Sequence, residues 1–208
     1  MRRQLSLPVQ ETGEERWRRN RRSIFALLQK SVIFAGKKQP VKTEMKESKT
    51  TSILFVCLGN ICRSPAAQAV MEHLAELRGV DHLFEIDSAG IGAWHTGQLP
   101  DHRMREHGSR RGYSFTHRAR QVKREDFGRF NYIIGMDEEN LHDLRRVAAT
   151  QENARKIRCL ADFLRQHPGQ TTVPDPYYGG PQDFELALDL IEDACDGLLE
   201  ALLAHSAI

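Results

Sequence analysis

Apolar and polar positions alternate in blocks from residue 53 to residue 203. A continuous apolar run at 53–56 predicts a strand that is buried on both faces. Three more short apolar runs predict further strands, at 84–86, 132–136 and 157–160. Helical patterns follow or separate these runs, over 66–77, through 103–107, from 137 onward and over 183–203. Strands that alternate with helices favour a three-layer α/β fold with a mostly parallel sheet.

Charge divides the chain near residue 50. Residues 1–50 hold 13 Lys and Arg against 5 Asp and Glu, a net charge of +8, whereas residues 51–208 hold 17 against 23, a net charge of −6. A polar stretch at 46–51 separates the two parts, so we expect a basic, flexible N-terminal extension over 1–50 and one domain over 51–208. The extension has two interpretations. It is either an artefact of start-site choice, with translation from Met45, or a real arm with an amphipathic helix around 16–34.

Composition limits the cellular location and the kinds of partner that we expect. The 208 residues are 40% hydrophobic and 28% charged, as in ordinary globular proteins, and four cysteines are too few for a disulfide scaffold. We therefore expect the cytoplasm, with secretion as the alternative. The longest apolar stretch, 24–35, is shorter than the roughly 18 residues of a membrane helix, so we expect no stable membrane insertion. A basic extension can reach an acidic partner or be a solvated arm, and we expect no nucleic-acid partner.

The strongest chemical signal lies between the first predicted strand and the first predicted helix. The sequence there reads Cys57-Leu58-Gly59-Asn60-Ile61-Cys62-Arg63-Ser64-Pro65. A loop that leads into a helix N-terminus presents free backbone N–H groups, and the helix dipole adds partial positive charge, so such a loop suits a dianionic phosphate. An arginine stands where the Walker nucleotide-binding pattern needs a lysine, and a cysteine opens the loop. The pattern predicts a phosphate site with cysteine chemistry.

Five residues of this loop have predicted chemical roles. The positive surroundings would stabilise the thiolate of Cys57, which is the form that attacks phosphorus. Arg63 would hold two phosphate oxygens with its planar fork of donors, and more tightly in the transition state. Ser64 would donate to the Cys57 sulfur and help it leave. Gly59 would let the backbone turn its amide inward, and Asn60 would adopt a left-handed conformation. The alternative is an inert, packed cysteine at a strand end.

A second motif, Pro174-Asp175-Pro176-Tyr177-Tyr178, supplies the acid that the leaving group needs. General acid catalysis of this kind contributes about 10²–10⁴-fold to the rate. The flanking prolines restrict the backbone of Asp175, and we expect burial near the anionic loop to raise the pKa of its carboxyl. An ordinary surface turn fits the same residues. The two tyrosines would form an aromatic wall for a flat substrate.

Together these residues resemble the low molecular weight protein tyrosine phosphatases over roughly residues 52–205. Beyond the loop at Cys57, the resemblance rests on motifs in the same order, namely Asp87-Ser88-Ala89-Gly90, Ala119-Arg120-Gln121, Asp126-Phe127, Tyr132-Ile133-Ile134, Met136-Asp137 and Asp175-Pro176-Tyr177-Tyr178-Gly179. It implies a four-stranded parallel sheet with helices on both faces. It also implies hydrolysis of phosphotyrosine in proteins by a monomer or weak dimer.

The resemblance further implies a role for each matching residue. Cys57 would be the nucleophile, Arg63 the phosphate clamp, and Asp175 the general acid and then the base for water. The rest of the loop would bind phosphate, through Leu58, Gly59, Asn60, Ile61, Cys62 and Ser64. Ser88 and His117 would support the hydrogen-bond network of the loop. The substrate cleft would be lined by Trp94, Tyr177 and Tyr178.

Two loop positions refine this picture, and two other positions depart from the family. Relatives that act on phosphoarginine carry threonine where this chain has Ile61, so the branched, apolar side chain favours an aryl phosphate. Cys62 fits a family trait, a reversible disulfide with the nucleophile that prevents irreversible oxidation, although a packed side chain is the alternative. Asn131 stands where many relatives have aspartate, and Gly135 replaces a bulkier residue in the third strand.

The sequence fits two rival activities and a metal site less well than it fits a phosphatase. Arsenate reduction on the same scaffold needs further cysteines on a mobile loop, whereas Cys159 and Cys195 are single and fall in predicted regular elements. A module that binds or carries phosphate without hydrolysis is disfavoured, because nucleophile, arginine and acid are all present. We expect no metal and no cofactor, since the histidines are scattered without a ligand pair, at His102, His107, His117 and His142.

Overall fold

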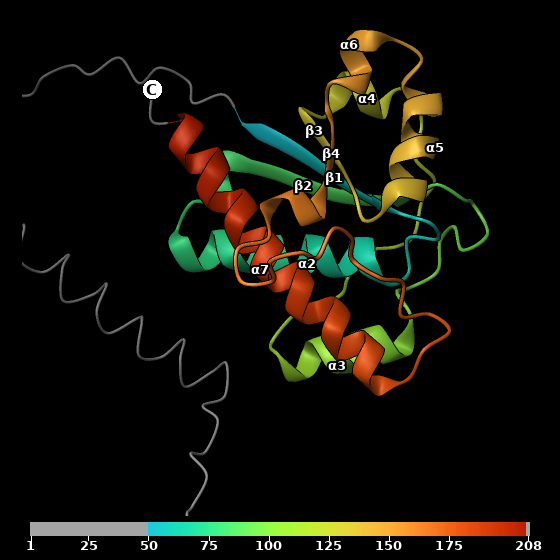
Figure 1. Cartoon of the computed structure of the whole chain (residues 1–208), viewed down its shortest axis with the longest axis vertical. Coiled ribbons are helices and arrows are strands. Elements are labelled where there is room, and N and C mark those ends of the chain that lie inside the picture. Colours follow the sequence, from blue (N-terminus) through green and yellow to red (C-terminus); the bar gives the residue numbers. More distant parts are fainter. Residues whose placement is uncertain (1–49, 207–208) are drawn as a thin grey trace, which may run out of the picture. The chain divides into compact units, whose positions relative to one another are not determined.

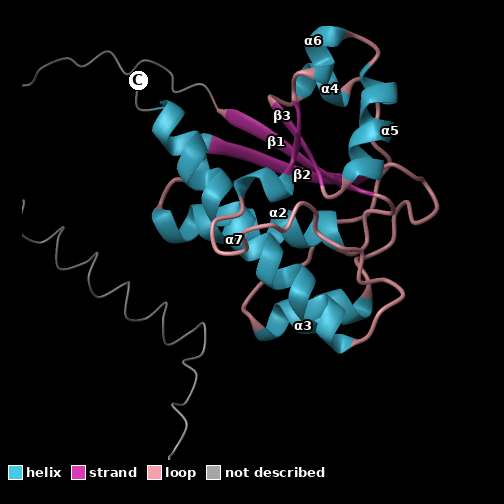
Figure 2. Ribbon diagram, in the orientation of Figure 1, coloured by secondary structure: helices cyan, strands magenta, loops and turns pink. Residues whose placement is uncertain are grey.

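The computed structural model describes residues 50–206, so the predictions for the N-terminal extension, including its helix around 16–34, lie outside this part of the chain. At its centre is a sheet of four parallel strands in the order β2-β1-β3-β4 (Figures 1 and 2). The strands are β1 (Thr51–Cys57), β2 (Phe84–Gly90), β3 (Tyr132–Gly135) and β4 (Ile157–Cys159). The expected four-stranded parallel sheet is confirmed.

Helices cover both faces of the sheet (Figure 1). One face carries α2 (Arg63–Arg78), α3 (His102–Arg110) and α7 (Pro181–Ser206). The other carries α4 (Asp126–Arg129), α5 (Glu138–Ala148) and α6 (Gln151–Ala154). The three-layer architecture agrees with the prediction.

The alternating side chains of β1 explain why both faces need a cover. Ile53 and Phe55 belong to the core beneath α2 and α7, whereas Leu54 and Val56 belong to the core beneath α5. All four side chains are fully buried. The continuous apolar run is therefore a central strand shared by two cores, as parallel sheets require.

The strands end at a common edge, which positions the chemistry-bearing loops. Cys57 at the end of β1 pairs with Gly90 at the end of β2, and Val56 pairs with Gly135 at the end of β3. Because all strands are parallel, the segments that follow them meet at this carboxyl edge. Ligands of open parallel sheets bind at such an edge.

Helix capping at this edge agrees with the local sequence. The Asp101 carboxylate accepts a hydrogen bond from the N–H of Arg103 and caps α3. The Asp137 carboxylate does the same for α5, through the N–H of Asn140. At its far end, α2 stops at Gly79, whose φ of 68° gives the left-handed conformation common at helix C-termini.

Several elements differ from the sequence prediction. The strand β2 continues through Asp87-Ser88-Ala89 to Gly90, four residues beyond its predicted end. The helices α4 and α6 and the 3-10 turns Asp81–Leu83 and Leu160–Phe163 were not predicted. Three or four residues are too few to show a helical period, so pattern analysis gives no signal for them.

The two departures from the family pattern act in the packing of the sheet. Asn131 Oδ1 accepts hydrogen bonds from the backbone N–H of Ser52 at 2.9 Å and from its hydroxyl at 3.0 Å, which ties the start of β1 to the segment before β3. At Gly135 a Cβ would lie 2.8 Å from Cδ2 of Leu141. The glycine therefore lets α5 approach β3 closely.

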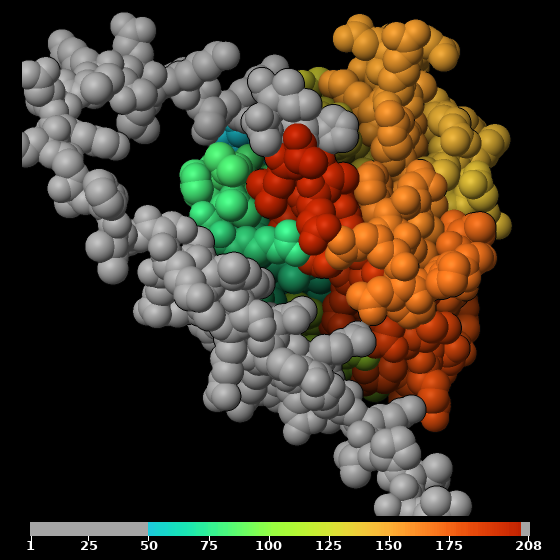
Figure 3. All heavy atoms as spheres, turned by 60° about the vertical axis from the view of Figure 1, so that its left-hand side comes forward, coloured from blue at the N-terminus to red at the C-terminus, as the bar shows by residue number. Residues whose placement is uncertain are grey.

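The long helix α7 packs against α2 and against the turn that follows β4. In the space-filling view its red C-terminal part lies between the green segment that contains the end of α2 and the orange segment after β4 (Figure 3). The approach to the orange segment is closest at Gly197, where a Cβ would lie only 2.1 Å from the carbonyl oxygen of Phe163. Between residues 50 and 206, no helix has both the length and the apolar character needed to cross a membrane.

Replacing Gly197 by alanine should therefore destabilise the domain. Alanine favours a helix by about 1 kcal/mol relative to glycine, but the added methyl group meets a backbone oxygen that cannot turn away, and overpacking of this kind costs about 1–3 kcal/mol. We expect a net loss in the free energy of unfolding, measured by urea denaturation. The matched control is Gly128→Ala in α4, where a Cβ has no neighbour within 4 Å and should be neutral or slightly stabilising. A Gly197→Ala protein as stable as the parent would contradict the packing argument.

Candidate active site

The loop between β1 and α2, residues 58–62, is called the phosphate loop below. Cys57 is the last residue of β1 and Arg63 is the first residue of α2, so the loop connects the carboxyl edge of the sheet directly to a helix N-terminus. Both residues are nearly inaccessible, with exposed fractions of 3% and 2%. Asn60 is one of two non-glycine residues in the described part of the chain with a positive φ, at 56°. The predicted left-handed conformation of Asn60 is confirmed.

Asn60 holds the loop through its side chain as well. Its Nδ2 donates to the hydroxyl of Ser64 and to that of Ser88, both at 3.0 Å. Its Oδ1 accepts from His117 Nε2 and from the backbone N–H of Arg120, both at 2.9 Å. The fully buried amide thus uses both donors and both acceptor positions. Ser88 and His117 lie where the family resemblance placed them.

The tautomer of His117 follows from this network. Because Asn60 Oδ1 can only accept, Nε2 of His117 carries the hydrogen. Burial lowers the pKa of His117; the nearby Asp87 opposes this change and Arg120 reinforces it. A neutral imidazole is therefore the form that supports the loop near neutral pH.

Ser64 connects this network to the sulfur of Cys57. The Ser64 hydroxyl lies 3.1 Å from Cys57 Sγ and 3.2 Å from the carbonyl oxygen of Ala89. The predicted contact between serine and sulfur is present. Ser88, in turn, donates to Oε1 of Gln68 at 2.8 Å, and sequence reasoning missed this glutamine because it looks like an ordinary polar position of α2.

The Arg63 guanidinium joins three segments of the chain. Nη1 donates to Asp137 Oδ2 at 2.5 Å and to the carbonyl oxygen of Val173 at 3.0 Å, and Nη2 donates to Asp175 Oδ2 at 2.6 Å. Burial opposes the charge, but Cys57 and the two aspartates outweigh it, so the pKa of Arg63 is raised. Its buried Nε–H has no hydrogen-bond partner among the described residues.

Asp137 is a site residue that sequence reasoning missed. The prediction used it as the start of a helix and as part of the motif Met136-Asp137, without a role at the site, and its Oδ1 does cap α5. Its other oxygen accepts from Arg63. The available signal was its place directly after the third strand, at the same edge as Cys57.

The expected burial of Asp175 is wrong. Its side chain is 39% exposed and forms an ion pair with Arg63. The carboxylate also accepts from the backbone N–H of Tyr177 at 3.1 Å, which is the turn chemistry that the sequence allowed. The segment 173–178, called the acid loop below, is attached to the residue that follows β3 by a hydrogen bond of 2.8 Å from Val173 N–H to the carbonyl oxygen of Met136.

The predicted aromatic residues are mostly exposed. Tyr177 is half-buried and meets Tyr178 edge-to-face at 4.9 Å, whereas Tyr178 itself is 97% exposed. Trp94 is also exposed, and its ring folds back over Gly92 of its own loop, where a Cβ would overlap the ring. Trp94 and Tyr178 are therefore accessible at the surface, and Tyr177 is partly accessible.

The remaining loop residues contact different surroundings. Leu58 is exposed and Ile61 is half-buried. A Cβ added at Gly59 would lie 3.1 Å from Cδ2 of the His95 ring. Gly59 has no positive φ and makes room for His95, and the inward direction of its amide stays a prediction. His95 was not predicted, since one histidine in a loop carries no pattern.

The four cysteines are buried free thiols. Burial raises the pKa of Cys62, and Asp101 and Cys57 add to this effect, so Cys62 is a neutral thiol beside the nucleophile. Cys159 lies in β4 and Cys195 in α7, in regular elements as predicted. Residues 50–206 contain no group of three His, Cys, Asp or Glu side chains that could hold a metal ion.

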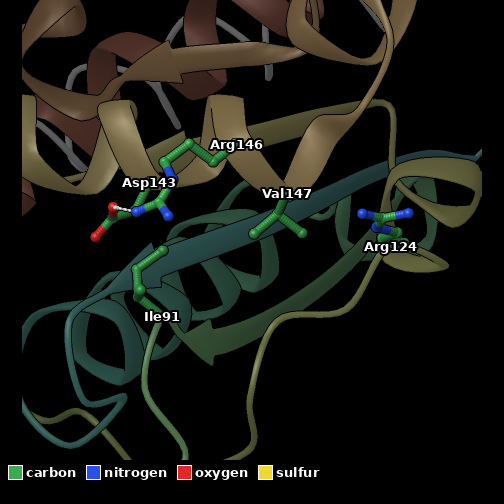
Figure 4. Close-up of a pocket in the computed structure, with 5 residues that line it drawn as sticks. All are labelled: Ile91, Arg124, Asp143, Arg146 and Val147. Carbon is green, nitrogen blue, oxygen red and sulfur yellow. Dashed lines mark ion pairs between the residues drawn. The ribbon is translucent and has the colours of Figure 1, made fainter.

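A shallow cavity of about 420 Å³ lies on the α5 side of the sheet (Figure 4). It is lined by Ile91, Arg124, Asp143, Arg146 and Val147. Asp143 forms an ion pair with Arg146, at 3.5 Å. The cavity contains none of the predicted site residues, although the N–H of Ile91 donates to the carbonyl oxygen of Cys57.

Comparisons with known proteins agree with this geometry. A family model described as low molecular weight phosphotyrosine protein phosphatase matches residues 52–207. The low molecular weight protein-tyrosine-phosphatase of Streptomyces coelicolor is 43% identical over 154 residues, which cover 74% of this chain and 94% of the relative. A protein tyrosine phosphatase from Entamoeba histolytica has a similar structure, with a TM-score of 0.72, 41% identity, and coverage of 75% of this chain and 99% of that one.

A structure described as a drosophila arginine phosphatase is also similar, with a TM-score of 0.67, 32% identity, and coverage of 72% of this chain and 96% of that one. Relatives whose names give different substrates therefore share the fold. The family model covers nearly all of the described residues, and the resemblance inferred from the motifs is confirmed. The chain belongs to the low molecular weight phosphotyrosine protein phosphatase family.

Proposed function

We propose that this enzyme hydrolyses phosphotyrosine in proteins through a phosphocysteine intermediate on Cys57. One observation carries the proposal: the buried Arg63, with an Nε–H that lacks a partner, stands at the N-terminus of α2 beside the buried thiol of Cys57. A buried donor without a partner is costly, and a phosphate oxygen would satisfy it. The phosphate-loop amides and the helix dipole would bind the other oxygens.

In the first step, the Cys57 thiolate attacks phosphorus and the bond to the tyrosine oxygen breaks. Asp175 gives its proton to the departing phenolate. Its carboxylate is paired with Arg63 at 2.6 Å before substrate arrives. A phosphate dianion competes for the same guanidinium, so the substrate and Asp175 share Arg63 as a partner.

In the second step, water attacks the phosphocysteine and the sulfur leaves as a thiolate. Asp175, now deprotonated, takes the proton of the attacking water, and orthophosphate is released. The Ser64 hydroxyl, 3.1 Å from Cys57 Sγ, donates to the departing sulfur. Asn60 keeps Ser64 in place because it donates to the same hydroxyl oxygen, so the single hydroxyl hydrogen can turn from the carbonyl oxygen of Ala89, 3.2 Å away, to the sulfur.

The substrate is an aryl phosphate in this proposal. The half-buried Ile61 of the phosphate loop offers an apolar contact, and Trp94, Tyr177 and Tyr178 lie at the surface where a flat ring would enter. The side chain of Ile61 also separates this chain from relatives that act on phosphoarginine, which carry threonine there. Phosphotyrosine-containing proteins are therefore the proposed partners.

Neither rival activity is favoured. Reduction of arsenate needs a relay of thiols on a mobile loop, but Cys159 and Cys195 are buried in β4 and α7. A pure carrier of phosphate needs no acid, whereas Asp175 is held next to the clamp arginine.

Four finer proposals accompany this function. The phosphatase domain spans 51–208, behind a basic extension over 1–50. The enzyme acts in the cytoplasm, which the sparse cysteines of the sequence favour. It works as a monomer or weak dimer. Cys62 protects Cys57 by a reversible disulfide. This proposal is supported by the place of Cys62 at the end of the phosphate loop, which begins directly after Cys57, and by its state as a buried, neutral thiol.

Cys57→Ser should abolish turnover of para-nitrophenyl phosphate, with a loss on the order of 10⁴-fold or more, because a serine hydroxyl here has no base to ionise it. Thermal unfolding should be almost unchanged. The matched control is Cys159→Ser, which replaces another buried cysteine far along the chain and should keep its turnover. Activity that survives in Cys57→Ser would refute the assigned nucleophile.

Asp175→Ala should lower kcat/KM by about 10²-fold for phenyl phosphate, whose leaving group needs a proton. The loss for dinitrophenyl phosphate should be much smaller, since that leaving group departs without one. The control is Asp183→Ala in the first turn of α7, where the carboxylate accepts from the backbone N–H of Gly180 and takes no part in the proposed chemistry. Equal losses on the two esters would mean that Asp175 is not the acid.

A further inference from the structure

Arg103, in the first turn of α3, connects the two loops that carry the proposed chemistry. On one side it is bound to Asp101, whose backbone N–H donates to the carbonyl oxygen of Ile61 at 2.7 Å. The Asp101 carboxylate accepts from the backbone N–H of Arg103 at 2.8 Å, from Nε at 3.0 Å and from Nη2 at 2.9 Å. This bidentate pair fixes the plane of the guanidinium relative to the phosphate loop.

On the other side, the same guanidinium lies against two aromatic rings. Its Cζ is 4.7 Å from the ring centroid of Phe184 and 5.4 Å from that of Tyr177, within the range of cation–π contacts. Phe184 is 1% exposed, lies at the start of α7 and stacks on His107 of α3, with ring centroids 5.7 Å apart. Phe184 is thus a fixed support, and Tyr177 is the part of the acid loop that rests on the guanidinium.

Tyr177 passes this restraint to the proposed acid. Its backbone N–H donates to Asp175 Oδ1 at 3.1 Å, so the position of Tyr177 sets where the carboxylate can lie. Asp175 is 39% exposed, so apart from its ion pair with Arg63 it has little packing of its own to hold it. A continuous series of contacts therefore joins the phosphate loop to the proposed acid, through Ile61, Asp101, Arg103, Tyr177 and Asp175.

We propose that Arg103 is a positioning residue, which holds the acid loop so that the Asp175 carboxyl faces the leaving-group oxygen of a phosphate bound at the phosphate loop. The inference rests on the proposed role of Asp175 as general acid. Arg103 takes no proton and touches no reacting atom. Its effect should therefore appear only for substrates whose leaving group needs the proton, because proton transfer depends steeply on the placement of the donor.

The test compares Arg103→Met with Arg103→Lys. Methionine keeps much of the apolar length over Phe184 but removes the charge and both side-chain bonds to Asp101, and lysine keeps the cation without the fork. The control is Arg110→Met at the other end of α3, where the arginine is exposed and pairs only with the exposed Glu106 of its own helix. Each variant is assayed for kcat/KM on phenyl phosphate and on dinitrophenyl phosphate.

For Arg103→Met we expect a loss of about tenfold on phenyl phosphate and a change within about twofold on dinitrophenyl phosphate. Arg103→Lys should show a smaller loss, again larger on phenyl phosphate than on dinitrophenyl phosphate. This variant decides the test alone if the methionine variant does not fold. Arg110→Met should change neither rate. In the Asp175→Ala background, Arg103→Met should cause no further loss, because the two substitutions remove the same step.

Equal losses on both esters, or losses that add in the double variant, would overturn the positioning role and leave Arg103 as a structural residue. If Asp175→Ala shows the ester preference and Arg103→Met does not, this inference alone is refuted. If Asp175→Ala itself lacks that preference, the proposed function is refuted instead. The two failures are therefore distinguishable.

Discussion

A buried guanidinium is the interaction on which the rest of the site depends. An arginine that is 2% exposed costs much free energy unless its charge is compensated. Here the compensation comes from Asp137, which follows β3 in the chain, from the carbonyl oxygen of Val173 and from Asp175 in the acid loop. Because these partners follow different strands, Arg63 also ties together the segments that meet at the carboxyl edge of the sheet.

The two carboxylates beside this guanidinium differ in their other contacts and in their exposure. Asp137 caps the N-terminus of α5 and also accepts from Arg63. Asp175 is the more exposed of the two, and it accepts from Arg63 and from the backbone N–H of Tyr177. In the proposed mechanism, Asp175 is therefore the carboxyl group that an incoming substrate can reach.

Local sequence predicted the parts of this site that form locally. The apolar run of β1, the loop from Cys57 to Arg63 and the periodic pattern of α2 are consecutive, so their order alone implied a loop at a helix N-terminus. The left-handed Asn60 followed from residue preference. Motif order added the strand count, and it singled out Ser88 and His117, which both hydrogen-bond to Asn60 and which no local pattern shows.

The parts that could not be predicted depend on tertiary contacts. Asp137 looks like a helix cap, and nothing near it in sequence indicates that its second oxygen binds Arg63, 74 positions earlier. The contacts of Arg103 with Tyr177 and Phe184 join α3 to residues far along the chain. The burial of Asp175 was mispredicted because the prolines beside it restrict the backbone but do not decide which way the loop faces.

In the proposed mechanism, the contrast between a buried nucleophile and an exposed acid follows from the geometry of the reaction. The phosphoryl group must be enclosed by the loop amides and by Arg63, so Cys57 and Asn60 can be held by packing from all sides. The leaving-group oxygen points out of the loop toward the rest of the substrate, and the acid has to meet it there. An acid in that position cannot be immobilised by burial without closing the entrance. Its placement must come from neighbours at the rim, and Tyr177 resting on Arg103 is a contact of that kind.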